Sequence, residues 1–189
     1  LPFAGLLYGM TGGRHRYKVH RETLYFEDLP DAFDGFTITQ LSDIHAGSFT
    51  NRSGVEKGVA LVNKQNSDLL LFTGDLVNNQ ASEMDPWIET FSKLKAPFGK
   101  YSVLGNHDYG DYKQWESKQA KYANLARLKK VHREIGFNLL LDQAVQIEKD
   151  GQSIALIGVE NWGKGGFHKY GDLVKATELT NDDEFKILM

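Results

Sequence analysis

Residues 36–45 read F-T-I-T-Q-L-S-D-I-H, an apolar and β-branched run that stops at an acidic residue. Such a run predicts a buried strand over residues 36–42 that leads into a loop at Asp43. Two later runs have the same form and also end in glycine or acidic residues, over residues 68–73 and 101–104. The chain therefore repeats one unit, a short strand followed by a polar loop.

Apolar residues at helical spacing predict helices between and after these strands. The predicted helices cover residues 52–65, 83–94 and 112–134. Ser53 is the expected N-cap of the first, Tyr122 is expected on the apolar side of the third, and Gly136 is the expected stop. A hairpin over residues 145–159 with a turn at Asp150 and Gly151, and a last short strand over residues 185–189, complete an α/β layered domain.

The amino-acid composition limits the kinds of metal site and partner that the chain can have. The 189 residues contain no cysteine, which excludes thiolate metal sites, cysteine nucleophiles and disulfides. Hydrophobic residues make up 41% of the chain and charged residues 25%, as in an ordinary folded domain. The net charge of -3 gives no support to a nucleic-acid partner. A metal here must be held by histidine, carboxylate and amide groups.

Groups of this kind follow each of the three strands. They are Asp43 and His45 after the first, Asp75 after the second, and Asn106, His107 and Asp108 after the third. Because ligands of open α/β sheets bind at the carboxyl ends of the strands, we expect these side chains to converge on one edge. Taken singly, each aspartate is also typical of a helix N-cap or a loop. Oxygen and imidazole donors without sulfur suit manganese, iron or zinc.

The motifs D-I-H at residues 43–45, G-D-L-V at 74–77 and G-N-H-D at 105–108 resemble the first three motifs of the calcineurin-like metallophosphoesterases, in the same order. The resemblance covers residues 36–189 and implies a four-layer α-β-β-α sandwich with two divalent metal ions.

The resemblance also assigns roles. Asp43 and His45 would bind one ion, Asp75 would bridge two ions, and Asn106 would bind the second. His107 would be the catalytic histidine and Asp108 would support it. The implied function is hydrolysis of phosphomonoesters or phosphodiesters by a hydroxide activated by the two metals.

The family pattern continues with a later histidine and a G-H-x-H element, and neither follows Gly105 here. We therefore expect the fold to be incomplete at the C-terminus and the 189-residue chain by itself to be weakly active or inactive. Two alternatives remain open, a noncatalytic scaffold that keeps the fold, and a nuclease. The intact motif at residues 105–108 argues against the first and the near-neutral charge against the second.

Residues 1–35 are expected to form a leader ahead of the domain at residues 36–189. An apolar run over residues 1–10 is followed by a basic cluster, Arg14, His15, Arg16, Lys18, His20 and Arg21. This pattern fits either a juxtamembrane segment on an anionic lipid surface or a leader packed on the domain. The first interpretation predicts a membrane-associated protein on the cytoplasmic face, with a lipid-linked or nucleotide-derived substrate.

Residues 160–172, rich in glycine, aromatic and basic side chains, are interpreted either as a loop at the mouth of the site that meets substrate or as a structural loop. This segment resembles the region that precedes a D-L-x-x-A helix in membrane-associated and cell-envelope members of the family, and the resemblance implies a short helix over residues 172–176. For His15, His20 and His132, surface or packing roles are expected.

Overall fold

The computed structural model describes residues 16–189, so Arg14 and His15 of the basic cluster lie outside the described residues. Its central sheet is parallel and contains the three strands predicted ahead of the motifs together with a short fourth strand. The strands are β1 (Ile38–Leu41), β2 (Leu69–Phe72), β3 (Lys100–Ser102) and a short β4 (Asn138–Leu139), in the order β1-β2-β3-β4. Leu41 pairs with Phe72, and Phe72 pairs with Ser102. The strands thus end in line, and the loops that follow them meet at one edge.

A second sheet lies against the first. It consists of β5 (Gln143–Lys149), β6 (Gln152–Gly158) and β7 (Lys186–Leu188). β5 and β6 form the predicted hairpin, and its turn residues Asp150 and Gly151 have φ of 50° and 80°, as the predicted D-G turn requires. β7 runs parallel to β6, so the last predicted strand is also confirmed.

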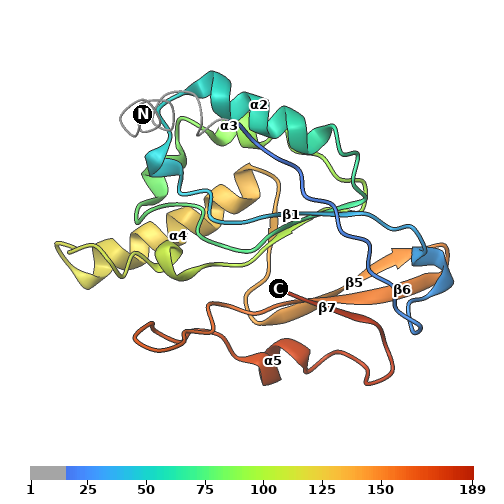
Figure 1. Ribbon diagram of the computed structural model, residues 1–189. Helices are drawn as coiled ribbons and strands as arrows, with labels where there is room; N and C mark the ends of the chain where they lie inside the picture. The colour runs from blue at the N-terminus through green and yellow to red at the C-terminus, as the bar shows by residue number, and fades with distance from the viewer. Residues whose placement is uncertain (1–15) are drawn as a thin grey trace, which may run out of the picture.

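Helices complete four layers, α-β-β-α (Figure 1). α2 (Arg52–Asn63), α3 (Ile88–Phe91) and α4 (Lys118–Glu134) cover one face of the parallel sheet, and α5 (Leu173–Thr177) lies beyond the second sheet. Short 3-10 helices stand in the loops: η2 (Asp31–Phe33), η3 (Ala46–Ser48), η4 (Ala81–Met84) and η5 (Asn106–Tyr109). The predicted fold class is therefore confirmed.

β2 explains why the run L-L-L-F is entirely apolar. Leu70 and Phe72 pack into the core under the helices, whereas Leu69 and Leu71 pack into the core between the two sheets. All four residues are buried because alternate side chains point to opposite faces and both faces are covered.

The prediction of a buried strand over residues 36–42 was wrong in one respect. β1 is exposed to partly exposed along its length, and Ile38 keeps 40% of its surface accessible. In the described chain β1 is an edge strand, hydrogen-bonded to β2 alone. Edge position depends on strand order, which the apolar run does not contain.

Three helix predictions need correction. Asn51 rather than Ser53 caps α2, because its side chain accepts a hydrogen bond from the backbone N–H of Gly54. The helix expected over residues 83–94 is divided into η4 and α3, with Pro86, which has no N–H to donate, between them.

The helix expected from residue 112 begins only at Lys118, with Ser117 as its N-cap. Tyr122, expected on its apolar side, is 67% exposed. Leu128 and Val131 do pack inward, and Gly136 ends the helix with a φ of 81°.

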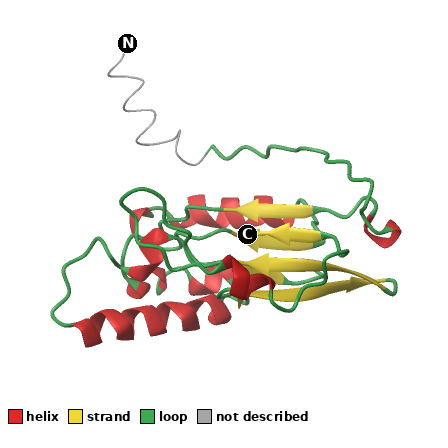
Figure 2. Cartoon of the chain, turned by 90° about the horizontal axis from the view of Figure 1, so that it is seen from below, coloured by secondary structure: helices red, strands yellow, loops and turns green. Residues whose placement is uncertain are grey.

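Figure 2 shows loops gathered at the end of the parallel sheet to which its arrowheads point. Residues 16–30 form no helix or strand and run along the outside of the molecule to η2, which lies near the opposite end of the sheet (Figure 2). None of the helices in residues 16–189 is long and apolar enough to span a bilayer.

Candidate metal centre

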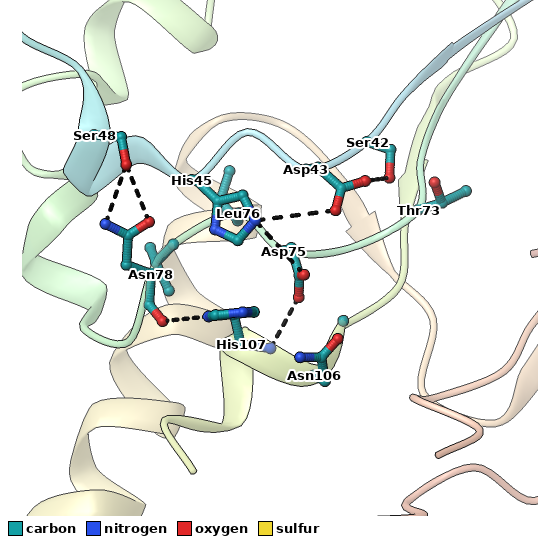
Figure 3. Close-up of polar contacts among 12 residues, drawn as sticks. Ser42, Asp43, His45, Ser48, Thr73, Asp75, Leu76, Asn78, Asn106 and His107 are labelled. Atoms are coloured by element: carbon teal, nitrogen blue, oxygen red, sulfur yellow. Dashed lines mark hydrogen bonds and ion pairs between the residues drawn. The ribbon is translucent and has the colours of Figure 1, made fainter. Parts of the chain in front are cut away.

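The loops after β1, β2 and β3 are joined through the Asp75 loop. The backbone N–H of Asp43 donates to the Gly74 carbonyl at 3.0 Å, and that of His45 donates to the Asp75 carbonyl at 3.0 Å. From the third loop, the backbone N–H of His107 donates to Asp75 Oδ1 at 2.9 Å. Asp75 therefore lies between the other two motifs, as Figure 3 shows.

Three side chains offer donor atoms to one small volume. His45, Asp75 and His107 each present a ligand atom, and these atoms lie within 4.8 Å of one another. His45 Nε2 is 3.8 Å from Asp75 Oδ2 and 3.9 Å from Asp43 Oδ1, and its ring stands at 89° to that of His107. The structure therefore brings Asp43, His45, Asp75 and His107 together, although they come from three separate loops.

The backbone at this edge is unusual. Asp43, His45 and Asp75 adopt φ angles of 53°, 46° and 60°, in the left-handed region that most side chains avoid. Residues held there cost on the order of 1–3 kcal/mol each and are concentrated at functional sites. Three such residues at one edge indicate that the chain is shaped for the placement of these side chains.

The glycines before the second and third motifs permit this arrangement. A Cβ on Gly74 would overlap with the backbone of Gly105, and a Cβ on Gly105 would overlap with the Asp75 carboxylate. The two loops thus touch backbone to backbone, which only glycine allows here.

The side chain of Asp108 links the same two loops by hydrogen bonds. Its fully buried carboxylate accepts hydrogen bonds from the backbone N–H groups of Gly105, Asp75 and Leu76 at 2.8–3.0 Å and from Val77 at 3.3 Å. Burial raises the pKa of this carboxyl to about 7, against the opposing effect of these hydrogen bonds. Asp108 was expected to support His107, and its carboxylate hydrogen-bonds to these backbone amides rather than to the imidazole.

The imidazole of His107 is oriented by Asn78 instead. Its Nδ1 lies 2.8 Å from the Asn78 carbonyl oxygen, which can only accept, so Nδ1 carries a proton. Glu83 fixes that carbonyl, because its carboxylate accepts from the backbone N–H groups of Asn78, Asn79 and Gln80. Sequence reasoning missed both residues, because Asn78 acts through its backbone carbonyl and the Glu83 carboxylate binds backbone N–H groups, and neither contact leaves a motif in the sequence.

Asn106 lies at the same edge, on η5 (Figure 3). Its side-chain nitrogen donates to the hydroxyl of Tyr112 at 2.8 Å, and the Tyr112 ring lies 4.6 Å from the His107 ring. Tyr112 was predicted to begin a helix, and it is instead part of the loop beside the centre.

The donor set fits a divalent cation. Within residues 16–189, Asp43 and Asp75 form ion pairs with His45 alone, so two carboxylates meet at this edge without a lysine or arginine to neutralise them. Carboxylate, imidazole and amide donors in an acidic environment are a set that manganese, iron and zinc accept.

The loop over residues 160–172 is joined to the third motif. Tyr109 donates to Glu160 at 2.7 Å and stacks on Tyr170 with ring centroids 3.6 Å apart, and Tyr170 donates to Asp111 at 2.8 Å. Burial opposes ionisation of Asp111, yet hydrogen bonds from Lys121 and Tyr170 lower the pKa of its carboxyl. At the outer part of the loop, Trp162 and Phe167 keep about half of their surface accessible, 51% and 54%.

Two other histidines of the described residues, His20 and His132, lie away from this edge. His20 is exposed. His132 is fully buried under the parallel sheet, with Nδ1 2.9 Å from the Ser102 hydroxyl, so its packing role is confirmed.

Comparison with known proteins gives one consistent family. The model of the family described as calcineurin-like phosphoesterase matches residues 36–189. A zebrafish (Danio rerio) protein named transmembrane protein with metallophosphoesterase domain is 33% identical over 58% of this chain. The uncharacterized metallophosphoesterase YkuE of Bacillus subtilis is 34% identical over 52%.

A Chlamydia muridarum protein named UDP-2,3-diacylglucosamine pyrophosphatase LpxG is 35% identical over 44% of the chain. The aligned regions make up 25%, 35% and 27% of these three relatives, so the chain spans about a quarter to a third of their length.

Proposed function

The chain belongs to the calcineurin-like phosphoesterase family, whose members are hydrolases of phosphoric esters, and we propose that the protein hydrolyses phosphomonoesters or phosphodiesters at the edge described above. The observation that supports this proposal most is the convergence of His45, Asp75 and His107 donor atoms within 4.8 Å. Three family motifs that are separate in sequence thereby share one site.

Two divalent ions, manganese, iron or zinc, would be held by this edge. Asp43 and His45 would hold one, Asn106 the other, and Asp75, whose carboxylate has two oxygens, would contact both. Ions bound there supply a water of lowered pKa and neutralise the charge that develops on phosphorus. Within the described residues these two carboxylates have no lysine or arginine partner, which supports this assignment.

His107 would act on the oxygen that leaves. Because Nδ1 is engaged by the Asn78 carbonyl, Nε2 is the nitrogen left to stabilise or protonate that oxygen. Asp108 would act indirectly, by holding the Asp75 and Gly105 loops at the distance that the site needs.

The substrate that we propose is lipid-linked or nucleotide-derived. Lys169 lies 3.7 Å over the ring of Trp162, so the loop that contacts the third motif offers aromatic and cationic groups side by side. Such a pair suits a phosphate next to an apolar group. The name of the Chlamydia relative describes a substrate of this class.

Membrane association at the cytoplasmic face follows from the same proposal. Arg16, Lys18 and Arg21 are exposed in the segment before the domain, where they would meet anionic lipid. The zebrafish relative and a Bos taurus relative that is 30% identical over 85% of this chain are both named transmembrane protein with metallophosphoesterase domain, which supports the membrane association but not the choice of face.

The test is an assay of the metal-stripped full-length protein on a chromogenic phosphodiester, with and without Mn²⁺. Asp75→Asn is the inactive variant, and Asp183→Asn, at an exposed position, is the matched control. We expect hydrolysis that needs Mn²⁺, is lost in Asp75→Asn and persists in the control. A folded protein that binds Mn²⁺ without hydrolysing this diester, a mononucleotide or a nucleoside-diphosphate-linked lipid would favour the scaffold.

A further inference from the structure

Tyr112 contacts two of the residues assigned above, although no motif includes it. Its hydroxyl accepts a hydrogen bond from Asn106 Nδ2 at 2.8 Å, and its ring lies 4.6 Å from that of His107 at 43°. We propose that Tyr112 is a positioning residue, which holds the Asn106 amide with its oxygen free to bind a cation at the metal centre. The inference rests on the proposed function, because it concerns the second ion.

The reason lies in the asymmetry of the amide. A side-chain amide has one end that accepts, Oδ1, and one end that only donates, Nδ2. A cation binds the oxygen alone, so an amide turned by 180° is no ligand at all. Because Nδ2 donates to the Tyr112 hydroxyl, Oδ1 is left free on the other branch of the amide. In the reversed amide the hydroxyl would donate to Oδ1 instead, so a cation on Oδ1 favours the orientation in which Tyr112 accepts, and this hydrogen bond then holds the amide in place.

Tyr112 is held by its neighbours rather than by burial of its own ring, which is 50% exposed. On one side, Asp111 is paired with Lys121 of α4 and accepts from Tyr170 at 2.8 Å. On the other, the indole N–H of Trp115 donates to the Gly110 carbonyl at 2.7 Å. The segment is thus fixed on both sides of Tyr112, and loss of its hydroxyl alone should leave the fold intact.

The variant Tyr112→Phe removes the hydroxyl and keeps the ring. We expect the affinity for one Mn²⁺ ion to fall about tenfold, the lower end of the range for a residue that orients a metal ligand, while the other ion is unaffected. Isothermal titration of the metal-free full-length protein with Mn²⁺ measures both affinities. Tyr122→Phe, at a 67% exposed tyrosine of α4, is the matched control and should change neither.

Two further variants identify the ion and the mechanism. Asn106→Ala should abolish the same affinity that Tyr112→Phe weakens. In Asn106→Asp both side-chain atoms are oxygens, so orientation no longer matters, and adding Tyr112→Phe should then cost less than twofold in affinity.

A merely structural tyrosine would give another pattern. If Tyr112→Phe weakens both ions equally, lowers the unfolding temperature of the metal-free protein, or leaves both affinities unchanged, the inference is wrong while the proposed function can stand. If the unaltered protein neither binds Mn²⁺ nor hydrolyses phosphoesters, both are wrong.

Discussion

At the scale of single residues, the centre depends on positions that tolerate no extra atom. Gly105 has φ −91° and ψ 178°, a conformation open to any residue, so its backbone does not require glycine. Glycine is required by the lack of space, because a Cβ there would overlap with Asp75 Oδ1 and with the Asp75 backbone nitrogen. A side chain at residue 105 would therefore displace the Asp75 carboxylate, which lies between the other two motifs.

Gly105→Ala should therefore separate the two loops and move the Asp75 carboxylate. Overpacking of this kind costs about 1–3 kcal/mol, and we expect that loss in urea unfolding of the metal-free protein together with weaker Mn²⁺ binding. Gly166→Ala is the matched control, since a Cβ at that glycine meets nothing within 4 Å. Equal stability of the two variants would show that the loops can part without cost.

His132 makes the fold sensitive to acid. Burial lowers the pKa of its imidazole to about 3, and its Nε2 has no hydrogen-bond partner among the described residues. The unfolded chain binds a proton below a pKa of about 6.5 and the folded chain does not, so stability is lost as the pH falls from about 6.5 towards 3. At pH 5 the loss attributable to this residue is about 2 kcal/mol.

The double variant His132→Leu with Ser102→Ala removes both members of the buried pair. Relative to the unaltered protein, it should gain about 2 kcal/mol between pH 7 and pH 5 in urea unfolding. Leu128→Ala, at a buried neighbour that cannot ionise, should lose the same amount at both pH values. A double variant whose deficit or gain does not change with pH would contradict the assignment.

At the scale of elements, local patterns predicted what local physics decides. The run L-L-L-F predicted β2 because four apolar residues in a row must be buried on both faces. The D-G turn predicted the hairpin because both of its residues need positive φ. Where a boundary depends on distant contacts, prediction failed: Tyr112 and Trp115 have helical spacing, yet contacts with Asn106 and Gly110 hold them in a loop.

The cap of α2 is a boundary that can be tested. Asn51 accepts from the Gly54 N–H at 3.0 Å, whereas Ser53 is exposed inside the helix. Asn51→Ala should cost about 1 kcal/mol, and Ser53→Ala should be neutral or slightly stabilising because alanine is the better helix former. The midpoints of urea unfolding give both values, and a larger loss at Ser53 would restore it as the cap.

At the scale of the whole molecule, the edge position of the candidate residues follows from topology. Parallel strands that end in register bring loops more than thirty residues apart to one place, so the convergence was predictable from the order of the motifs. The hydrogen bonds that hold these loops in place were not predictable from the sequence. Asp108 and Glu83 act on backbone N–H groups, and Tyr109 meets Glu160 across 51 residues, contacts that only the folded chain reveals.

A cation held by three loops should stabilise the whole fold, since the unfolded chain cannot present the same ligands. At a free Mn²⁺ concentration a hundred times the dissociation constant, the gain is about 2.7 kcal/mol. For a chain of this size that corresponds to a rise of about 5–10 °C in unfolding temperature, reversed by a chelator. Differential scanning fluorimetry of the full-length protein measures it.

The variant Asp75→Asn distinguishes a metal ligand from a structural aspartate by its unfolding temperature without and with Mn²⁺. The amide oxygen can still accept from the His107 N–H, and the change removes a carboxylate that no lysine or arginine among residues 16–189 neutralises. The metal-free variant should thus be as stable as the unaltered protein or more so, while its response to Mn²⁺ is lost. Asp183→Asn should keep the full response. If Asp75→Asn unfolds earlier without metal and still gains the full rise with Mn²⁺, the carboxylate supports the fold and the ion binds elsewhere.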